Sequence, residues 1–194
     1  MSVDEVDEAA PPEFCSYERF GLRFFQHAVS VERITAGVSG LTGAPIEFGP
    51  IAAGPAKIAK VHATGAIGEP VVSPRADVEP LRFGLHVPVD LRFALSLPAT
   101  THRFRADVGI GLTLTVRAAE PLRVVIDIDP PESGDITVLL KAEGLTSSVL
   151  QWVSGMDGEL KRFLVRYIRA EIAKPHIVRA RSVDLRPFVR DAEQ

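Results

Sequence analysis

The chain has 194 residues, 46% of them hydrophobic and 24% charged, with a formal net charge of −3. This composition is typical of a soluble globular protein, and the charge gives no general preference for nucleic acid. The single cysteine, Cys15, excludes an intrachain disulfide and a cysteine-based metal cluster. The sequence has neither a signal-peptide h-region nor about 18 successive apolar residues, so we expect a cytoplasmic protein without a membrane-spanning helix.

The two ends of the sequence differ in charge. Six acidic residues and no Lys or Arg lie in segment 1–18. We expect segment 1–15 to be a disordered acidic tail, followed by one domain over 16–190. The other end is basic and carries Lys161, Arg162, Arg166, Arg169, Lys174, Arg179, Arg181, Arg186 and Arg190. Such a basic region is the solvated face of a helix, or a surface for peripheral contact with an anionic membrane.

The first part of the domain contains a predicted helix followed by short segments. Apolar residues recur every three or four positions over 17–39, which predicts an amphipathic helix that ends at the glycines near Val38. Segment 43–55 is rich in Gly, Pro and Ala, but its short apolar runs could form an edge strand. Segment 58–67 is a predicted strand with Val61 and Ala63 on one face, and segment 71–80 is a predicted loop.

Two long stretches then alternate apolar and polar residues. In the first, the odd positions are apolar: Phe83, Leu85, Val87, Val89, Leu91, Phe93, Leu95 and Leu97. In the second, the even positions are apolar: Phe104, Ala106, Val108, Ile110, Leu112, Leu114 and Val116. A period of two gives each strand one apolar face and one polar face. At about 3.3 Å per residue the first strand would be about 50 Å long, so its apolar face needs an equally long cover.

Two further alternating segments, 122–128 and 136–142, are separated by a turn sequence that contains two prolines. Four successive strands with short loops predict an antiparallel meander, because a parallel return needs a long crossover. Pro88 interrupts the first long strand and cannot donate to a ladder, so it marks an edge, a bulge or a bend. Gly109 and Gly111 on the next strand permit the same bend, and we expect a strongly curved sheet.

The period returns to three or four over segment 147–174. This pattern predicts a helix about 40 Å long that Pro175 ends. A last strand is expected over segment 178–188. The predicted fold class is therefore α+β: a strongly curved antiparallel β-meander of long strands wrapped around a long amphipathic C-terminal helix, together with an N-terminal helix.

This order of elements resembles that of the tubular lipid-binding (TULIP) superfamily. The superfamily includes the mitochondrial-lipid-binding domains of membrane contact sites and the bactericidal/permeability-increasing proteins. The segment from Ile46 to Ile58 is similar to the apolar-Gly-x-x-Pro-x-Ile segment that opens the sheet in those domains. The resemblance implies an apolar seam between sheet and helix that holds acyl chains. Typical members carry a signal peptide, a membrane anchor or a tandem second domain, none of which we expect here.

The sequence lacks the usual catalytic and metal-binding patterns. Its five histidines are scattered without a pair at i,i+4, and no Gly-x-Ser-x-Gly sequence occurs. The glycine-rich segment 49–57 lacks Gly-Lys-Ser/Thr, and its prolines remove backbone donors that a phosphate would need. The aromatic residues that follow Arg92 and Arg103 lie on the apolar face, so we do not expect nucleic acid as a partner. We expect no catalytic residue, no metal and no cofactor.

Four charged residues, Asp90, Arg92, Arg105 and Asp107, share the polar face of the two long strands. Cross-strand ion pairs are the expected arrangement, each worth about 0.2–1 kcal/mol. An active site is the alternative, and it would require these groups to be buried.

We therefore expect non-enzymatic binding or transfer of an apolar ligand, such as an acyl lipid. The residues expected to line the seam are Phe83, Leu85, Leu91, Phe93, Leu95, Val108, Ile110, Leu112, Leu114, Leu160, Phe163, Leu164 and Tyr167. The small Ala106 and the adaptable Met156 would leave room for a pocket, and a solid core is the alternative. Two other functions stay open: an enzyme on a helix-grip scaffold similar to polyketide cyclases and START-like proteins, and a ligand-free domain that forms a homodimer.

Overall fold

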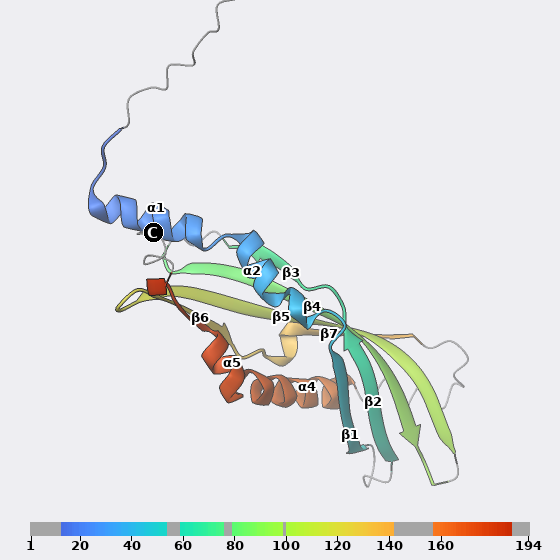
Figure 1. Ribbon diagram of the computed structural model, residues 1–194. Coiled ribbons are helices and arrows are strands. Elements are labelled where there is room, and N and C mark those ends of the chain that lie inside the picture. Colours follow the sequence, from blue (N-terminus) through green and yellow to red (C-terminus); the bar gives the residue numbers. More distant parts are fainter. Residues whose placement is uncertain (1–12, 54–58, 76–78, 99, 142–156, 188–194) are drawn as a thin grey trace, which may run out of the picture.

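The computed structural model describes residues 13–53, 59–75, 79–98, 100–141 and 157–187 (Figure 1). The helices are α1 (Tyr17–Ala28), α2 (Val31–Val38), α4 (Asp157–Ile172) and α5 (Pro175–Ala180), with the 3-10 turns η1 (Ser39–Leu41) and η3 (Ser133–Asp135). The strands are β1 (Pro45–Ala53), β2 (Ala59–Ile67), β3 (Val71–Pro74), β4 (Leu81–Ser96), β5 (Thr101–Ala119), β6 (Arg123–Asp129), β7 (Ile136–Lys141) and β8 (Ser182–Asp184). None of the described helices is long and apolar enough to cross a membrane.

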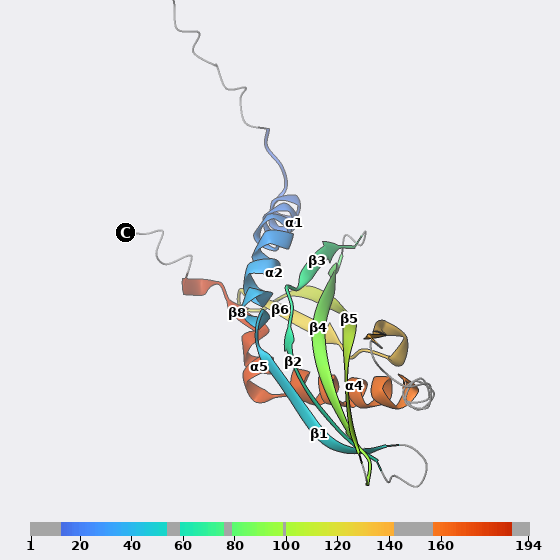
Figure 2. The ribbon, with the colours of Figure 1, turned by 90° about the vertical axis from the view of Figure 1, so that its right-hand side faces the viewer.

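The strands form one antiparallel sheet built on a long central pair. The pair is β4 and β5, which are in register from Leu81 opposite Val116 to Ser96 opposite Thr101. Shorter strands lie end to end on each side of it: β2 and β3 along β4, and β7 and β6 along β5. Strands β1 and β8 extend the sheet beyond β2 and β6. The sheet is strongly curled (Figure 2), so the predicted α+β class and curved antiparallel sheet of long strands are confirmed.

The last step of the predicted meander is wrong. Strand β7 does not pair with β6, which precedes it in the chain. Instead, β6 pairs with Thr113–Ala119 of β5, and β7 pairs with Arg105–Ile110 of the same strand. The reason lies in the connection, where Pro130 and Pro131 precede η3 and offer no backbone N–H for a tight hairpin. The chain therefore pairs first with the C-terminal half of β5, through β6, and then with its N-terminal half, through β7.

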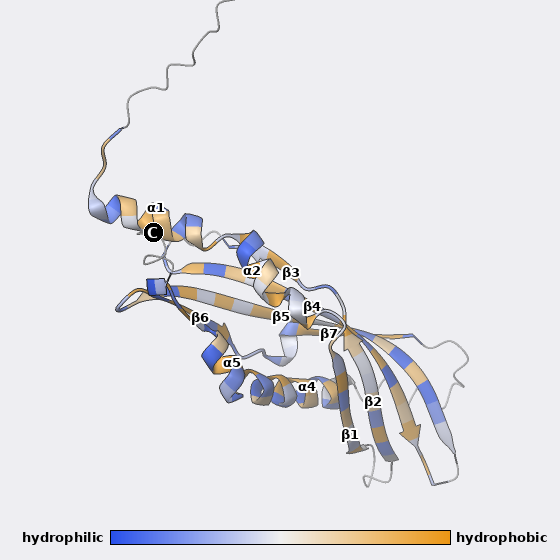
Figure 3. Ribbon diagram, in the orientation of Figure 1, coloured by the Kyte–Doolittle hydropathy of each residue, from blue (hydrophilic) through white to orange (hydrophobic). Residues whose placement is uncertain are grey.

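The alternation of β4 and β5 determines which face of the sheet is buried. Every odd residue of β4 from Phe83 to Leu95 is buried, and Leu95 is 0% exposed. On β5 the buried residues of this face include Phe104, Ala106 and Val108. Figure 3 shows apolar and polar residues alternating along the long strands. Since burial of each large apolar side chain contributes about 1.5–3 kcal/mol, this face holds most of the favourable burial energy.

Pro88 lies at a local edge, which was one of the three predicted alternatives. It is opposite Gly109 in the unbroken β4–β5 ladder. On its other side, pairing with β2 ends at Val89 and pairing with β3 begins at His86. The carbonyl of Pro88 accepts a hydrogen bond from the Gly68 N–H at 2.8 Å, so its nitrogen also faces this junction. The missing donor therefore falls where no strand requires it.

The predicted helix over 17–39 is two helices. Ser30 has extended backbone angles, and its hydroxyl accepts from the Arg33 N–H, which caps the start of α2. Helix α1 has no buried residue, and its stacked rings Phe20 and Phe24 are 61% and 57% exposed. The edge strand within 43–55 is confirmed as β1, and the strand over 58–67 as β2. The loop predicted over 71–80 is wrong in part, because Val71–Pro74 forms β3.

The C-terminal half follows the predicted order with shorter elements. The described part of the helix expected over 147–174 is α4. Residues 147–156, which include Met156, lie outside the described residues. Segment 1–12 of the expected tail also lies outside them. Pro175 is the first residue of α5, a position where its missing N–H costs nothing. The strand predicted over 178–188 is reduced to β8, which pairs with β6.

The curl of the sheet places α4 against its apolar face. In Figures 1 and 2, β1 and β2 bend past one end of α4, while β6 and β8 lie towards its other end. Helix α4 also contacts β7 and η3, and helix α2 contacts β3. The two helices therefore cover different parts of the same long sheet.

Candidate functional site

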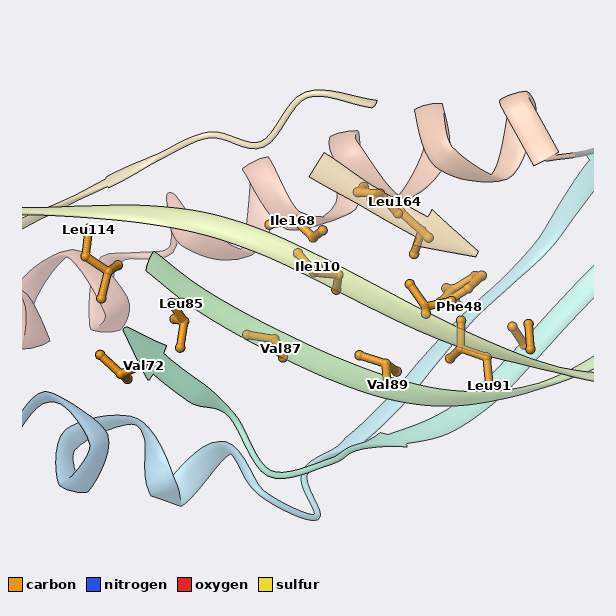
Figure 4. Close-up of a cluster of buried hydrophobic side chains, with 14 of the residues drawn as sticks. Phe48, Val72, Leu85, Val87, Val89, Leu91, Ile110, Leu114, Leu164 and Ile168 are labelled. Atoms are coloured by element: carbon orange, nitrogen blue, oxygen red, sulfur yellow. The ribbon is translucent and has the colours of Figure 1, made fainter. Parts of the chain in front are cut away.

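The residues predicted to line the seam all lie on the apolar side of the sheet or on α4. Nine of them are buried: Phe83, Leu85, Leu91, Phe93, Leu95, Val108, Ile110, Leu114 and Leu164. The other four are half-buried at the margin of this cluster: Leu112, Leu160, Phe163 and Tyr167. Figure 4 shows the side chains of β4 and β5 with Leu164 and Ile168 of α4 above them. The structure thus brings the predicted residues together as one packed cluster.

Aromatic rings join the helix to the edge of the sheet. Phe48 of β1 lies with its ring centroid 4.8 Å from Phe163 and 6.0 Å from Tyr167 of α4. The same ring meets Phe93 edge-on at 6.3 Å, and Phe93 stacks on Phe104 at 5.0 Å. Such pairs add about 0.5–1.5 kcal/mol beyond the area that they bury. The packing of α4 on the sheet therefore centres on Phe48.

Phe48 is the seam residue that sequence reasoning missed. It lies in the Gly/Pro-rich segment next to Gly49 and Pro50, where the register of β1 and β2 shifts between Phe48 and Ile51. This bulge interrupts the alternation, so the periodic signal that identified the long strands was absent. The aromatic residue inside a strand-breaking sequence was the only available sign of its role.

Tyr167 places a polar group at the margin of the apolar cluster. Burial, together with the negative charge of Glu171, raises the pKa of its phenol. The hydroxyl therefore stays neutral and can act as a hydrogen-bond donor or acceptor. Among the described residues the only fully buried polar side chain is Thr115, which is on the polar face of β5, whereas Tyr167 is half-buried.

Among the described residues, helix α4 is shorter than the apolar face on which it lies. Strand β4 has 16 residues and is about 53 Å long at 3.3 Å per residue. Helix α4 also has 16 residues but is about 24 Å long at 1.5 Å per residue. Part of the apolar face lies at the margin of this cover, where Leu112, Ile126 and Ile128 are half-buried.

The opposite, polar face of the sheet carries a depression of ≈ 770 Å³. Its polar lining comes from four strands: His62 and Thr64 on β2, Arg92 on β4, Arg103 and Arg105 on β5, and Lys141 on β7. The register explains this grouping, because Thr64, Arg92, Arg105 and Lys141 lie opposite one another in a single row. The alternation in the sequence predicts that these residues lie on the polar face. Their arrangement in one row follows only from the pairing of the strands, which the alternation does not reveal.

The predicted ion pairs between β4 and β5 are wrong. The register places Arg92 opposite Arg105, and Asp90 opposite Asp107, so like charges face each other. Asp107 instead pairs with Lys141 on β7, with 2.8 Å between Oδ2 and Nζ. This hydrogen bond and the charge of Asp107 raise the pKa of Lys141. The expectation failed because the residues' positions in the sequence do not reveal which of them become direct neighbours.

Several basic residues of the C-terminal region bind other groups of the fold. Lys174 forms an ion pair with Glu171, Arg169 donates to the Pro131 carbonyl, and Arg181 donates to the Ile172 carbonyl. Arg186 forms an ion pair with Asp184, whereas Arg190 lies outside the described residues. Much of this charge therefore stabilises α4, α5 and β8 themselves.

Within the described part of the chain, no group of three His, Cys, Asp or Glu side chains is arranged to hold a metal ion. His62 lies on the polar face beside Glu47, with 3.3 Å between Nε2 and Oε1. Cys15 is exposed ahead of α1. No protein-family model matches the sequence, and no curated protein matches it either.

Proposed function

We propose that this protein binds or transfers an apolar ligand, such as an acyl lipid, without catalysing a reaction. The observation that carries the proposal is the long apolar face of the sheet, along whose margin Leu112, Ile126 and Ile128 are half-buried in the part of the chain that the structure describes. The face is about 53 Å long, and among the described residues α4 lies along about 24 Å of it while α2 contacts β3. An extended hydrocarbon chain fits such a long, narrow apolar strip better than a compact polar substrate does.

The composition of the seam favours the same class of ligand. Its lining is aliphatic and aromatic, and at its margin Leu112, Leu160 and Phe163 are half-buried. Side chains at a margin have room to change rotamer, so an acyl chain can enter without breaking strand pairing. The Tyr167 hydroxyl is a neutral polar group close to this margin and suits an ester or carboxyl group better than a metal or a phosphate.

The proposal includes peripheral contact with an anionic membrane as the source of the ligand. The exposed Arg162, Arg166 and Arg179 lie on α4 and α5, next to the seam. Basic residues near a surface attract anionic lipid by about 1 kcal/mol each. A protein that collected acyl lipids would benefit from this attraction during loading.

Native mass spectrometry of freshly purified protein, followed by lipid extraction, tests the proposal. We expect a bound species of lipid mass. Leu112→Trp should reduce the bound fraction, because the larger side chain fills the margin of the seam. Leu139→Trp is the matched control, since Leu139 is 68% exposed and lies outside the apolar face on β7. A wild-type protein that stays free of ligand after incubation with phospholipids and fatty acids would contradict the proposal.

The two other functions are distinguished by the same experiment. A dimer mass with no bound ligand would favour a domain that associates through its apolar surface. A small polar product or substrate retained in the seam would favour an enzyme on a helix-grip scaffold. In that family the long helix normally ends the domain, whereas here α5 and β8 follow α4 and β8 joins the sheet.

A further inference from the structure

A second site is suggested by the basic depression on the polar face of the sheet. Arg92 and Arg105 are directly opposite each other on β4 and β5. Like charges in this position destabilise an antiparallel pair. Neither residue, nor the neighbouring Arg103, forms an ion pair with any residue that the structure describes. The part of the chain that the structure describes therefore holds three arginines close together without an ion pair to any of them.

Among the described residues, the carboxylates in the same row of the sheet or the next one either pair with other groups or form no ion pair. Asp107 is held by Lys141 at 2.8 Å, and Glu47 is held by His62 at 3.3 Å. Asp90 lies in the adjacent row, opposite Asp107, and makes no ion pair with a described residue. The positive charge of the arginines thus stays concentrated on a protein whose overall formal charge is −3.

The shape of the surface supports binding as much as its charge does. Small side chains form the floor: Thr64 lies opposite Arg92, and Ala94 lies between His62 and Arg103 in the neighbouring row. The longer arginine side chains rise on the two central strands beside this floor. The volume of ≈ 770 Å³ is that of a small-molecule site, which typically has about 300–1,000 Å³. A concave surface lined by one sign of charge also concentrates the electric field.

We propose that this depression binds a phosphate-bearing anion with at least two negative charges. Arginine presents planar, paired donors that match two phosphate oxygens at once. Arg92 and Arg105, on adjacent strands, would hold one phosphate between them, and Arg103 would reach a second charge. A phosphate between the guanidinium groups would also remove their mutual repulsion. The site is on the opposite face from the apolar seam, so it does not depend on the function proposed above.

Phosphate of this kind has two sources, a soluble phosphoester or a lipid head group. Inorganic pyrophosphate, titrated by calorimetry at low salt, probes the first source. Flotation with phosphatidylcholine vesicles that contain phosphatidic acid, compared with phosphatidylcholine alone, probes the second. Binding of pyrophosphate alone assigns a soluble ligand, and recovery with the phosphatidic acid vesicles assigns a head group. Either result supports the proposal, provided that it depends on the arginines.

The decisive variant is the double substitution Arg92→Gln and Arg105→Gln. We expect about a tenfold loss of affinity for the probe that binds, with an unfolding temperature no lower than that of the wild type. The matched control is Arg19→Gln with Arg23→Gln, which removes the same charge from exposed positions on α1, outside both proposed sites. If the double variant does not fold, Ala94→Glu tests the same site by placing a carboxylate on its floor. Failure of both probes to bind the wild type, or equal losses in the site variant and the control, would overturn the proposal.

Discussion

The rings of Phe48 and Phe163 lie with their centroids 4.8 Å apart and connect the edge strand β1 to helix α4. Phe48 is 6% exposed, and it also contacts Tyr167 on the next turn of the helix and Phe93 on β4. An edge strand has only one neighbour for backbone pairing, so its second attachment must come from side chains. Phe48 supplies that attachment for β1.

Replacing Phe48 with Ala should destabilise the fold by about 3–5 kcal/mol, because it leaves a large cavity. A double-mutant cycle with Phe163→Ala should give a coupling energy of about 0.5–1.5 kcal/mol. Chemical denaturation measures both quantities. Phe20→Ala is the matched control, since Phe20 is 61% exposed on α1 and should change stability little. Equal effects at Phe48 and Phe20 would show that Phe48 does not hold α4 on the sheet.

Gly65→Ala should disrupt the pairing of β2 with β4. A Cβ atom at Gly65 would lie 2.0 Å from the Asp90 carbonyl oxygen and 2.8 Å from a Leu91 methyl group. The carbonyl belongs to the strand backbone and cannot move aside without breaking the ladder, so we expect a loss of about 1–3 kcal/mol or more. Gly21→Ala on α1 is the control, since no atom lies within 4 Å of its Cβ position. In this exposed helix alanine should stabilise by up to about 1 kcal/mol, and a similar loss at both glycines would contradict the prediction.

Asp184 gives the fold a dependence on acidic pH. Hydrogen bonds from the Arg186 side chain and backbone N–H lower its pKa from 3.8 to about 2. A carboxyl whose pKa is lower in the folded state contributes stability above its ordinary pKa and loses it as pH falls. The contribution should therefore be complete at neutral pH and disappear between about pH 4 and pH 2.

Thermal unfolding of Arg186→Gln at several pH values measures this contribution. The variant should unfold below the wild-type temperature at neutral pH, and the two temperatures should converge as pH approaches 2. Arg179→Gln serves as the comparison, because Arg179 is exposed and makes no side-chain ion pair with a described residue. A difference between wild type and Arg186→Gln that stayed constant down to pH 2 would refute the assignment.

The long strands were predictable because the polarity of each residue of β4 indicates which face of the sheet it occupies. From Phe83 to Leu95 the alternation continues without an error, and burial follows it at every position. Helix α4 was predictable because its apolar residues recur every three or four positions, as on one face of a helix. Strand β3 was not, because four residues ending in Pro74 are too few to show a period. The break between α1 and α2 was missed, although Ser30 is a good N-cap residue, since the apolar stripe continues across it.

Strand pairing was harder to predict than the strands themselves. Alternation shows which face of β7 is buried, but it does not say which part of which strand lies beside it. The same uncertainty concealed the basic depression, whose arginines become neighbours only through the pairing of Arg92 with Arg105. The apolar seam was predictable as a set because all its members share one face. The margin at Leu112 was not, since it depends on where α4 begins and ends.

At the row of Pro88 and Gly109 the described sheet is only three strands wide, comprising β4, β5 and β7. The rows near Thr64 and Arg92 are wider, because β1, β2 and β7 all take part. A narrow ribbon twists more easily than a wide sheet, so bending at this waist disturbs few hydrogen bonds. The two ends of the sheet can therefore change their mutual angle while each keeps its own register. We expect the breadth of the apolar seam to be adjusted at Pro88, in the row where β7 contacts helix α4.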